Sequence, residues 1–194
     1  KQLATRTYYA RLTQAMVTAL SAPMAEGKLY EVDMRLRPSG NQGPVATSIA
    51  SFKDYQTSAA WTWEHLALTR ARPIAGPIGL QDDIESFRRE LIAGAQDVQK
   101  IFDDTAAMRE KIEAAKGQGD EWDAKLGAGR MQDIELFSQA ACLTSGEIDR
   151  SVSAGILQAV ALKLISETEA KKLEDVYSTF WAIQAVSKLL SEKP

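Results

Sequence analysis

The sequence has very few of the residues that mark metal-binding and disulfide-rich proteins. It contains one cysteine, Cys142, and one histidine, His65, in 194 residues. A single cysteine excludes an internal disulfide, so the chain fits a reducing cytoplasm. The Cys-x-x-C, His-Glu-x-x-His, P-loop and Gly-x-Gly-x-x-Gly motifs are also absent. Their absence removes the common zinc, redox and nucleotide-binding signatures.

An excess of basic charge and long apolar runs are lacking too. The 23 Lys and Arg residues are outnumbered by 26 Asp and Glu residues, giving a net charge of −3 and a pI near 5.3. Nucleic-acid-binding domains usually carry a clustered basic face, and a membrane span needs about 20 apolar residues. We therefore expect no nucleic-acid partner and no membrane partner. Because the chain begins without Met and at once enters a helical pattern, we expect it to be a piece of a longer protein.

Apolar residues at steps of three and four dominate what is present. Such steps predict a first helix that ends at Pro23, a helix that follows Ser48 and a third across residues 60–72. Beyond residue 77, all periodic segments are helical, and the last of them starts at a Ser166–Glu169 capping box. Five helices with short connections indicate an antiparallel bundle. The sequence therefore predicts a mainly α chain.

One segment breaks the helical pattern. Residues 28–38 alternate strictly between apolar and charged side chains, which predicts a strand with one apolar and one charged face. A lone strand is not stable, because its backbone donors and acceptors need a partner. We therefore expect the other strands of its sheet to lie upstream. A linker rich in Pro and Gly at residues 73–79 predicts a domain boundary between residues 76 and 77.

The charged face of the predicted strand holds the candidate site. Glu31, Asp33, Arg35 and Arg37 occupy alternate positions on it. Carboxylate oxygens are the ligands that Mg²⁺ prefers, and the planar fork of Arg matches phosphate oxygens. A ladder of cross-strand salt bridges on an exposed face explains the same pattern. Spacing alone leaves both interpretations open.

The amino-acid sequences of three blocks resemble those of a known protein family. Residues 29–48 (LYEVDMRLRPSGNQGPVATS), 60–72 (AWTWEHLALTRAR) and 123–139 (DAKLGAGRMQDIELFSQ) resemble the glutamine synthetase adenylyltransferase family, in that family's order. The family belongs to the polymerase-beta-like nucleotidyltransferases. The resemblance implies that residues 1–76 are the C-terminal portion of the nucleotidyltransferase palm. It also implies that residues 77–194 form a helical accessory domain.

The resemblance further implies a reaction. Three carboxylates hold two Mg²⁺ ions, which bind the triphosphate of ATP, and AMP passes to a tyrosine of glutamine synthetase, which regulates nitrogen assimilation. Asp33 matches the third carboxylate, so it is the expected catalytic residue and metal ligand. Arg35 and Arg37 are the expected cofactor-binding residues, as phosphate or salt-bridge partners. The Gly-Ser-x-Asp-x-Asp segment that carries the first two carboxylates is absent. We therefore expect the isolated chain to be inactive. The blocks resemble the AMP-adding half of the family more than the AMP-removing half.

Two other functions remain open at this point. The chain is alternatively a non-catalytic helical module that docks glutamine synthetase or a PII-type signalling protein. A uridylyltransferase relative is disfavoured by the block at residues 60–72.

Several residues outside the strand need a role as well. We expect His65 to be structural rather than a catalytic base, and Cys142 to be a buried, inert thiol. Glu64, Arg70 and Arg72 either reach the nucleotide or pin their helix to the charged face of the strand. The acids Asp133 and Glu135 lie near a helix start, and a buried pair linking Asp133 to Lys125 or Arg130 is the preferred role. The four tryptophans are expected in the core.

Overall fold

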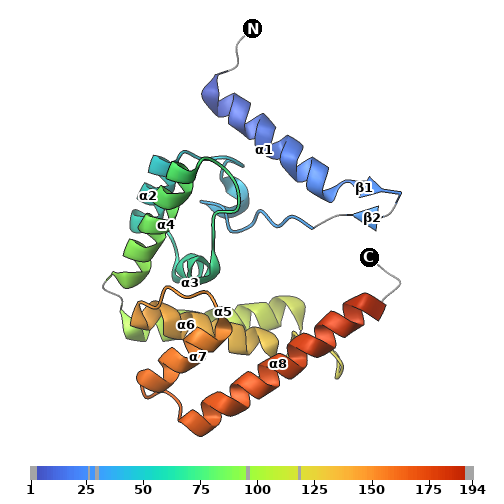
Figure 1. Cartoon of the computed structure of the whole chain (residues 1–194), viewed down its shortest axis with the longest axis vertical. Helices are drawn as coiled ribbons and strands as arrows, with labels where there is room; N and C mark the ends of the chain where they lie inside the picture. The colour runs from blue at the N-terminus through green and yellow to red at the C-terminus, as the bar shows by residue number, and fades with distance from the viewer. Residues whose placement is uncertain (1–3, 26, 29–30, 95–96, 118, 191–194) are drawn as a thin grey trace. The chain divides into compact units, whose positions relative to one another are not determined.

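The structure is a computed structural model of the chain, and it describes residues 4–25, 27–28, 31–94, 97–117 and 119–190 (Figure 1). The chain divides into two compact units, residues 1–60 and residues 61–191. Each unit is described by itself below. Within the described residues, no helix is both long enough and apolar enough to cross a membrane. The mainly α prediction is confirmed, because helices dominate both units.

The first unit starts with the predicted amphipathic helix. Helix α1 spans Thr5–Ser21 and buries none of its residues. A short hairpin of β1 (Pro23–Met24) and β2 (Gly27–Lys28) follows, with the two strands antiparallel. A 3₁₀ turn, η1 (Gly40–Gln42), and helix α2 (Ile49–Ser58) complete the unit. The side chain of Ser48 accepts a hydrogen bond from the Ser51 N–H, which satisfies one free donor at the start of α2 as expected.

The predicted strand at residues 28–38 is much shorter than expected. Among the described residues, only Gly27–Lys28 pairs in a ladder, while residues 31–34 belong to no strand and residues 35–43 form turns. Leu29 and Tyr30 lie outside the described residues. A strand forms only where a neighbour accepts and donates its backbone hydrogen bonds. The alternating pattern is present in the sequence, but the ladder partner it needs is not among the described residues of this chain.

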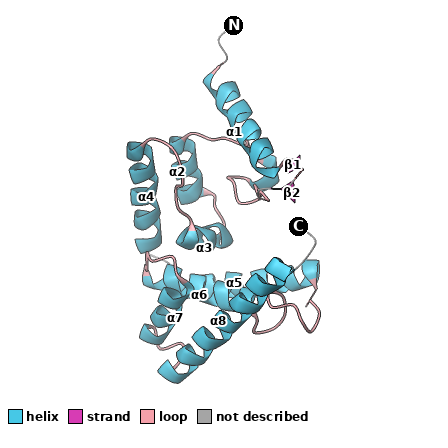
Figure 2. Cartoon of the chain, turned by 45° about the vertical axis from the view of Figure 1, so that its right-hand side comes forward, coloured by secondary structure: helices cyan, strands magenta, loops and turns pink. Residues whose placement is uncertain are grey.

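The second unit is a set of helices around α6. It comprises α3 (Thr62–Arg70), α4 (Ile78–Ala93), α5 (Val98–Lys116), α6 (Met131–Ser145), α7 (Val152–Ala161) and α8 (Glu167–Leu190). Helix α6 contacts each of the other five, and Figures 1 and 2 show it between α5 and α7. Its small residues Ala140 and Ala141 are fully buried, which lets neighbouring helices approach closely. Helix α6 is therefore the central element of this unit.

Two apolar clusters hold the unit together. One joins α3, α4, α5 and α6 through Leu66, Ile92, Ile101, Ala140 and Leu143. The other joins α6, α7 and α8 through Ile134, Val152, Ile156 and Ala170. Because Leu66 on α3 belongs to the first cluster, the compact unit already begins at Trp61. The predicted domain boundary at residues 76 and 77 lies inside this unit and stays a prediction about the domains of a longer protein.

Three of the four tryptophans are not in the core. Trp61, Trp122 and Trp181 expose 67%, 84% and 58% of their surface, and Trp63 is half-buried. Trp61 precedes the first turn of α3, Trp122 lies in the loop before α6, and Trp181 follows the part of α8 that packs on α6 and α7. The prediction of four core tryptophans is wrong because Trp61 and Trp122 lie outside the helices, and because spacing along α8 does not show where that helix stops contacting its neighbours.

Gly155 marks the closest approach of α6 and α7. A Cβ at this position would overlap the Ser138 hydroxyl and carbonyl oxygens and come within 2.8 Å of the Ser138 carbonyl carbon. Gly155→Ala is therefore expected to lower the free energy of unfolding by about 1–3 kcal/mol, the usual cost of overpacking. Gly79→Ala is the matched control, because nothing lies within 4 Å of its Cβ on α4. The control is expected to be neutral or slightly stabilising. Urea unfolding followed by circular dichroism measures both, and equal stabilities would contradict the close approach.

Candidate functional site

Asp33 and Arg35 form an exposed pair in the first unit. The Arg35 backbone N–H donates to Asp33 Oδ1 at 2.9 Å, and its Nε lies 3.0 and 2.9 Å from the two carboxylate oxygens. The Arg35 Nη2 donates to Asp33 Oδ2 at 2.5 Å. These hydrogen bonds and the carboxylate charge raise the pKa of Arg35 above its usual value. The side chains stay 68% and 55% exposed, so both are accessible to a ligand.

Arg37 has a different environment. Its guanidinium reaches back to Met34 O at 2.7 Å and forward to Gly43 O at 3.1 Å. It also donates to the backbone and side-chain oxygens of Asn41, at 3.1 and 3.4 Å. The side chain is half-buried in the loop that it spans. The two arginines expected to bind a cofactor thus have separate partners in this structure.

The loop after Asp33 is tightly turned. Ser39 and Gly40 have φ of +61° and +53°, in the left-handed region that non-glycine residues seldom occupy. A Cβ on Gly43 would overlap the Pro38 carbonyl oxygen and lie 3.0 Å from the Pro38 carbonyl carbon. The Pro-Ser-Gly-Asn-Gln-Gly segment therefore folds back on itself as its turn chemistry predicts. The loop closes over the Arg37 guanidinium.

The predicted magnesium site has one candidate ligand among the described residues, the Asp33 carboxylate. Asp33 offers exposed carboxylate oxygens, the donor type that Mg²⁺ prefers. No cluster of three or more His, Cys, Asp or Glu side chains suited to a metal ion occurs in the part of the chain that the structure describes. Asp33 thus fits one ligand position, and a two-metal site needs carboxylates that these residues do not provide. The roles of Asp33, Arg35 and Arg37 in catalysis stay predictions.

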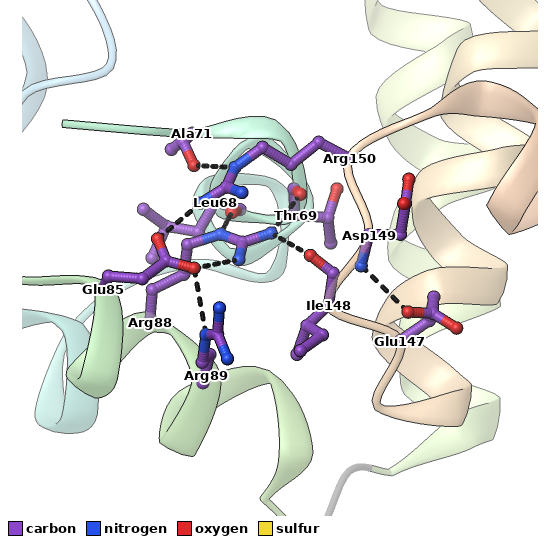
Figure 3. A network of polar contacts seen from close by, with 10 residues as sticks. All are labelled: Leu68, Thr69, Ala71, Glu85, Arg88, Arg89, Glu147, Ile148, Asp149 and Arg150. Atoms are coloured by element: carbon purple, nitrogen blue, oxygen red, sulfur yellow. Dashed lines mark hydrogen bonds and ion pairs between the residues drawn. The ribbon is translucent and has the colours of Figure 1, made fainter. Parts of the chain in front are cut away.

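Sequence reasoning missed the most buried charged group of the second unit. Arg88 on α4 is only 2% exposed (Figure 3). It donates to Leu68 O at 2.7 Å and Thr69 O at 2.5 Å, at the end of α3, and to Ile148 O at 2.9 Å in the loop before α7. Burial and the neighbouring charge of Arg150 lower the pKa of Arg88. Arg88 therefore caps α3 and ties it to two other segments.

Glu85 provides the negative charge for this cluster. Its carboxylate pairs with Arg88 at 3.1 Å, with Arg89 at 3.2 Å, and with Arg150 from the loop before α7. Burial alone would raise the pKa of Glu85, but the Arg89 hydrogen bond and the charges of Arg88 and Arg150 lower it overall. Arg150 also donates to Ala71 O at 2.8 Å. Glu85 and Arg88 are three residues apart on one helix, so the sequence could have predicted their pairing. The pairing of Arg150 with Glu85 joins residues distant in sequence, so local spacing could not have predicted it.

One further ion pair corrects the expected role of Asp133 on α6. Asp133 accepts hydrogen bonds from Arg109 Nε at 3.0 Å and from the Gly129 N–H at 2.9 Å. Its partner is therefore Arg109 on α5, and the expected pair with Lys125 or Arg130 is wrong. Arg130 instead donates to backbone carbonyls in the loop before α6. A contact between residues 24 apart in sequence could not be read from local spacing.

Helix α3 is pinned within its own unit. Arg70 pairs with Glu135 on α6 at 3.1 Å, and the Tyr177 hydroxyl on α8 donates to the same carboxylate at 3.2 Å. Burial, followed by the charge of Glu135, raises the pKa of Tyr177. Glu64 is buried, and its Oε2 accepts the Trp61 N–H at 3.0 Å, at the start of α3. Arg70 thus links α3 to α6, and Glu64 holds the first turn of α3. The two roles weighed for Glu64, Arg70 and Arg72, at the nucleotide or against the strand, stay predictions.

Cys142 is buried in α6 as expected, with 3% of its surface exposed. Burial, with smaller contributions from Glu147 and Asp149, raises the thiol pKa to about 11. We expect native Cys142 to react with iodoacetamide at pH 8 at least 10²-fold more slowly than the urea-unfolded chain, because little thiolate forms. The folded thiol holds its proton more tightly than the unfolded one, so its contribution to stability declines as the pH rises from about 9 to 11. Equal labelling rates would contradict this burial.

Comparison with known proteins confirms the resemblance predicted from the three blocks. A sequence model described as Glutamate-ammonia ligase adenylyltransferase matches residues 1–86. Three relatives are each described as a bifunctional glutamine synthetase adenylyltransferase/adenylyl-removing enzyme. The one from Brucella suis biovar 1 (strain 1330) is 53% identical over 143 residues, covering 74% of this chain and 14% of the relative. The one from Mesorhizobium japonicum is 42% identical over 192 residues, covering 97% and 20%. The one from Xanthobacter autotrophicus is 38% identical over 187 residues, covering 94% and 19%. The chain thus spans between a seventh and a fifth of the length of these relatives.

Proposed function

Because this chain corresponds to one segment of the glutamine synthetase adenylyltransferase family, we propose that it contributes to ATP-dependent transfer of AMP to a tyrosine of glutamine synthetase. The contribution is one edge of the nucleotidyltransferase site, with Asp33 as the third carboxylate. The remaining acids come from the part of the longer protein that precedes this segment. The protein works in the cytoplasm, where its single cysteine stays reduced.

The observation that carries this proposal is the exposed Asp33 carboxylate, which lies beside a loop held by the hydrogen bonds of Arg37. Asp33 lies directly before the turn that Arg37 and Gly43 close, so its backbone is anchored on one side, while its side chain stays 55% exposed beside Arg35. Mg²⁺ held there in the complete enzyme would stabilise negative charge on the triphosphate. Arg35 brings a guanidinium to the same place, and that group matches phosphate oxygens. The chain's own residues would therefore hold and orient the nucleotide.

An alternative proposal is a docking module for glutamine synthetase or a PII-type signalling protein. The C-terminal half of α8 favours this alternative because its apolar side chains are exposed. The N-terminal half of the same helix, by contrast, packs on α6 and α7. These exposed residues are Trp181, Ile183, Val186, Leu189 and Leu190. On this alternative, Asp33 has no part in the function.

AMP incorporation into glutamine synthetase discriminates the two proposals. A full-length enzyme that carries this segment is expected to transfer AMP, whereas the 194-residue chain alone is expected to transfer none. Loss of transfer on changing Asp33, with synthetase binding intact, supports the catalytic role. Unchanged transfer supports the docking role.

A further inference from the structure

The two arginines beside Asp33 differ in what holds them. All three guanidinium nitrogens of Arg37 donate within the loop, to Met34 O, Gly43 O and the two oxygens of Asn41. These acceptors come from both ends of the turn. Moving Arg37 would therefore leave the carbonyls on each side of the loop without their shared donor.

The side chain of Arg35, by contrast, donates its hydrogen bonds to Asp33. Its Nε and Nη2 both donate to the Asp33 carboxylate, at 2.5–3.0 Å. The pair is solvent-exposed on both sides, with 68% of the Arg35 side chain accessible. An exposed ion pair of this kind is only weakly favoured over its hydrated parts. Rotation of the Arg35 side chain would leave the four Arg37 hydrogen bonds within the loop intact.

We infer that the two arginines have separate roles at this site. Arg37 holds the 34–43 loop in place through its hydrogen bonds. Arg35 forms an ion pair with Asp33, and this pair breaks when a divalent cation binds the carboxylate. This inference rests on the proposed role of Asp33 as a metal ligand. It also changes the expectation that both arginines bind phosphate, because only Arg35 becomes available to an anion.

The physical reason is competition for the same lone pairs. A carboxylate engaged by a two-pronged guanidinium has few lone pairs left for a cation, and a guanidinium within contact distance repels that cation. Divalent cation binding at Asp33 is therefore coupled to departure of Arg35. The departing guanidinium is then close to the anionic groups that accompany the cation. Arg37 has no comparable effect, because its charge is held by the loop carbonyls.

The test uses Mn²⁺ alone as the probe on the 194-residue chain. Paramagnetic broadening of backbone amide signals near Asp33 reports cation affinity, and ¹⁵N order parameters report loop mobility. Arg35→Gln is expected to tighten Mn²⁺ binding about two- to fivefold, in line with the weak coupling of exposed pairs. It should leave the order of the loop unchanged.

Arg37→Gln is expected to do the reverse. The order parameters of Gly40, Gln42 and Gly43 should fall from about 0.85 towards 0.6 or lower, and Mn²⁺ binding should not tighten as it does in Arg35→Gln. Arg11→Gln on α1 makes the same change in net charge at an exposed position and serves as the control. It should change neither readout.

Three outcomes decide the matter. The expected pattern in Arg35→Gln and Arg37→Gln supports the division of roles. Equal tightening by both variants, or an ordered loop in Arg37→Gln, overturns it while Asp33 remains the Mn²⁺ ligand. Asp33→Asn should abolish the broadening around residue 33. If that variant binds Mn²⁺ as well as the unchanged chain, Asp33 is not the Mn²⁺ ligand of this chain and the division of roles fails. The metal role of Asp33 in the complete enzyme is decided separately, by AMP transfer in the full-length Asp33→Asn variant.

Discussion

Asp33→Asn in a full-length enzyme carrying this segment is expected to lower the rate of AMP transfer by about 10²- to 10³-fold. Losing one preorganised electrostatic group at a charged transition state has a cost of this size. Asparagine keeps the shape and one oxygen of the side chain but removes the negative charge. The Asp33 side chain is 55% exposed and asparagine has nearly the same size, so the fold should be retained.

Glu31→Gln is the matched control for that change. Glu31 is an exposed acid two positions before Asp33, and its substitution removes the same charge from the same segment. Radiolabelled AMP incorporation into glutamine synthetase measures both variants, and pull-down of the synthetase checks that docking is intact. A Glu31 variant as inactive as the Asp33 variant would indicate that overall negative charge, rather than Asp33 itself, is needed. Full activity in Asp33→Asn would leave the docking proposal as the better one.

Arg88→Met is expected to destabilise the helical unit by about 3–5 kcal/mol. Removing one partner of a buried ion pair leaves the other without compensation. The variant also removes the donor for the carbonyls of Leu68, Thr69 and Ile148, which end α3 and precede α7. Methionine fills a similar volume, so the loss reports hydrogen bonds and charge more than a cavity. Urea unfolding followed by circular dichroism is the measurement.

Arg89→Met provides the contrast, because Arg89 pairs with the same Glu85 carboxylate but is 56% exposed. Its effect should stay within about 0.5 kcal/mol, as for other exposed pairs. A double change of Glu85 and Arg88 to apolar residues should be less destabilising than the sum of the single changes, because neither charge is then left buried alone. Equal effects of the two arginine variants would show that burial does not set the strength of this cluster.

Local sequence signals predicted the elements whose causes are local. The helix after Ser48 begins where a serine side chain can accept a free N–H, and the last helix follows the Ser166–Glu169 box. The turn after Asp33 follows from its Pro, Ser and Gly residues. The blocks at residues 29–48, 60–72 and 123–139 pointed to the family that the comparisons confirm. Each of these depends on residues within a few positions of one another.

Strand length and side-chain pairing were not predictable in the same way. Alternation at residues 28–38 marks two faces, but only a neighbouring strand converts alternation into a ladder, and the described residues pair no further than Gly27–Lys28. Partners distant in sequence, such as Arg109 with Asp133 and Arg150 with Glu85, arise from helix packing. Spacing along the chain carries no information about them. The exposed tryptophans show the same limit.

The sequence by itself thus determined the helical class, the turn that follows Asp33 and the family to which the segment is related. Tertiary structure decided which charges are buried, which arginine holds a loop and which meets a carboxylate. The physical reason is the range of the interactions. Caps, turns and helical periodicity arise within about one turn of the chain. Desolvation and ion pairing, by contrast, depend on whatever the fold brings alongside.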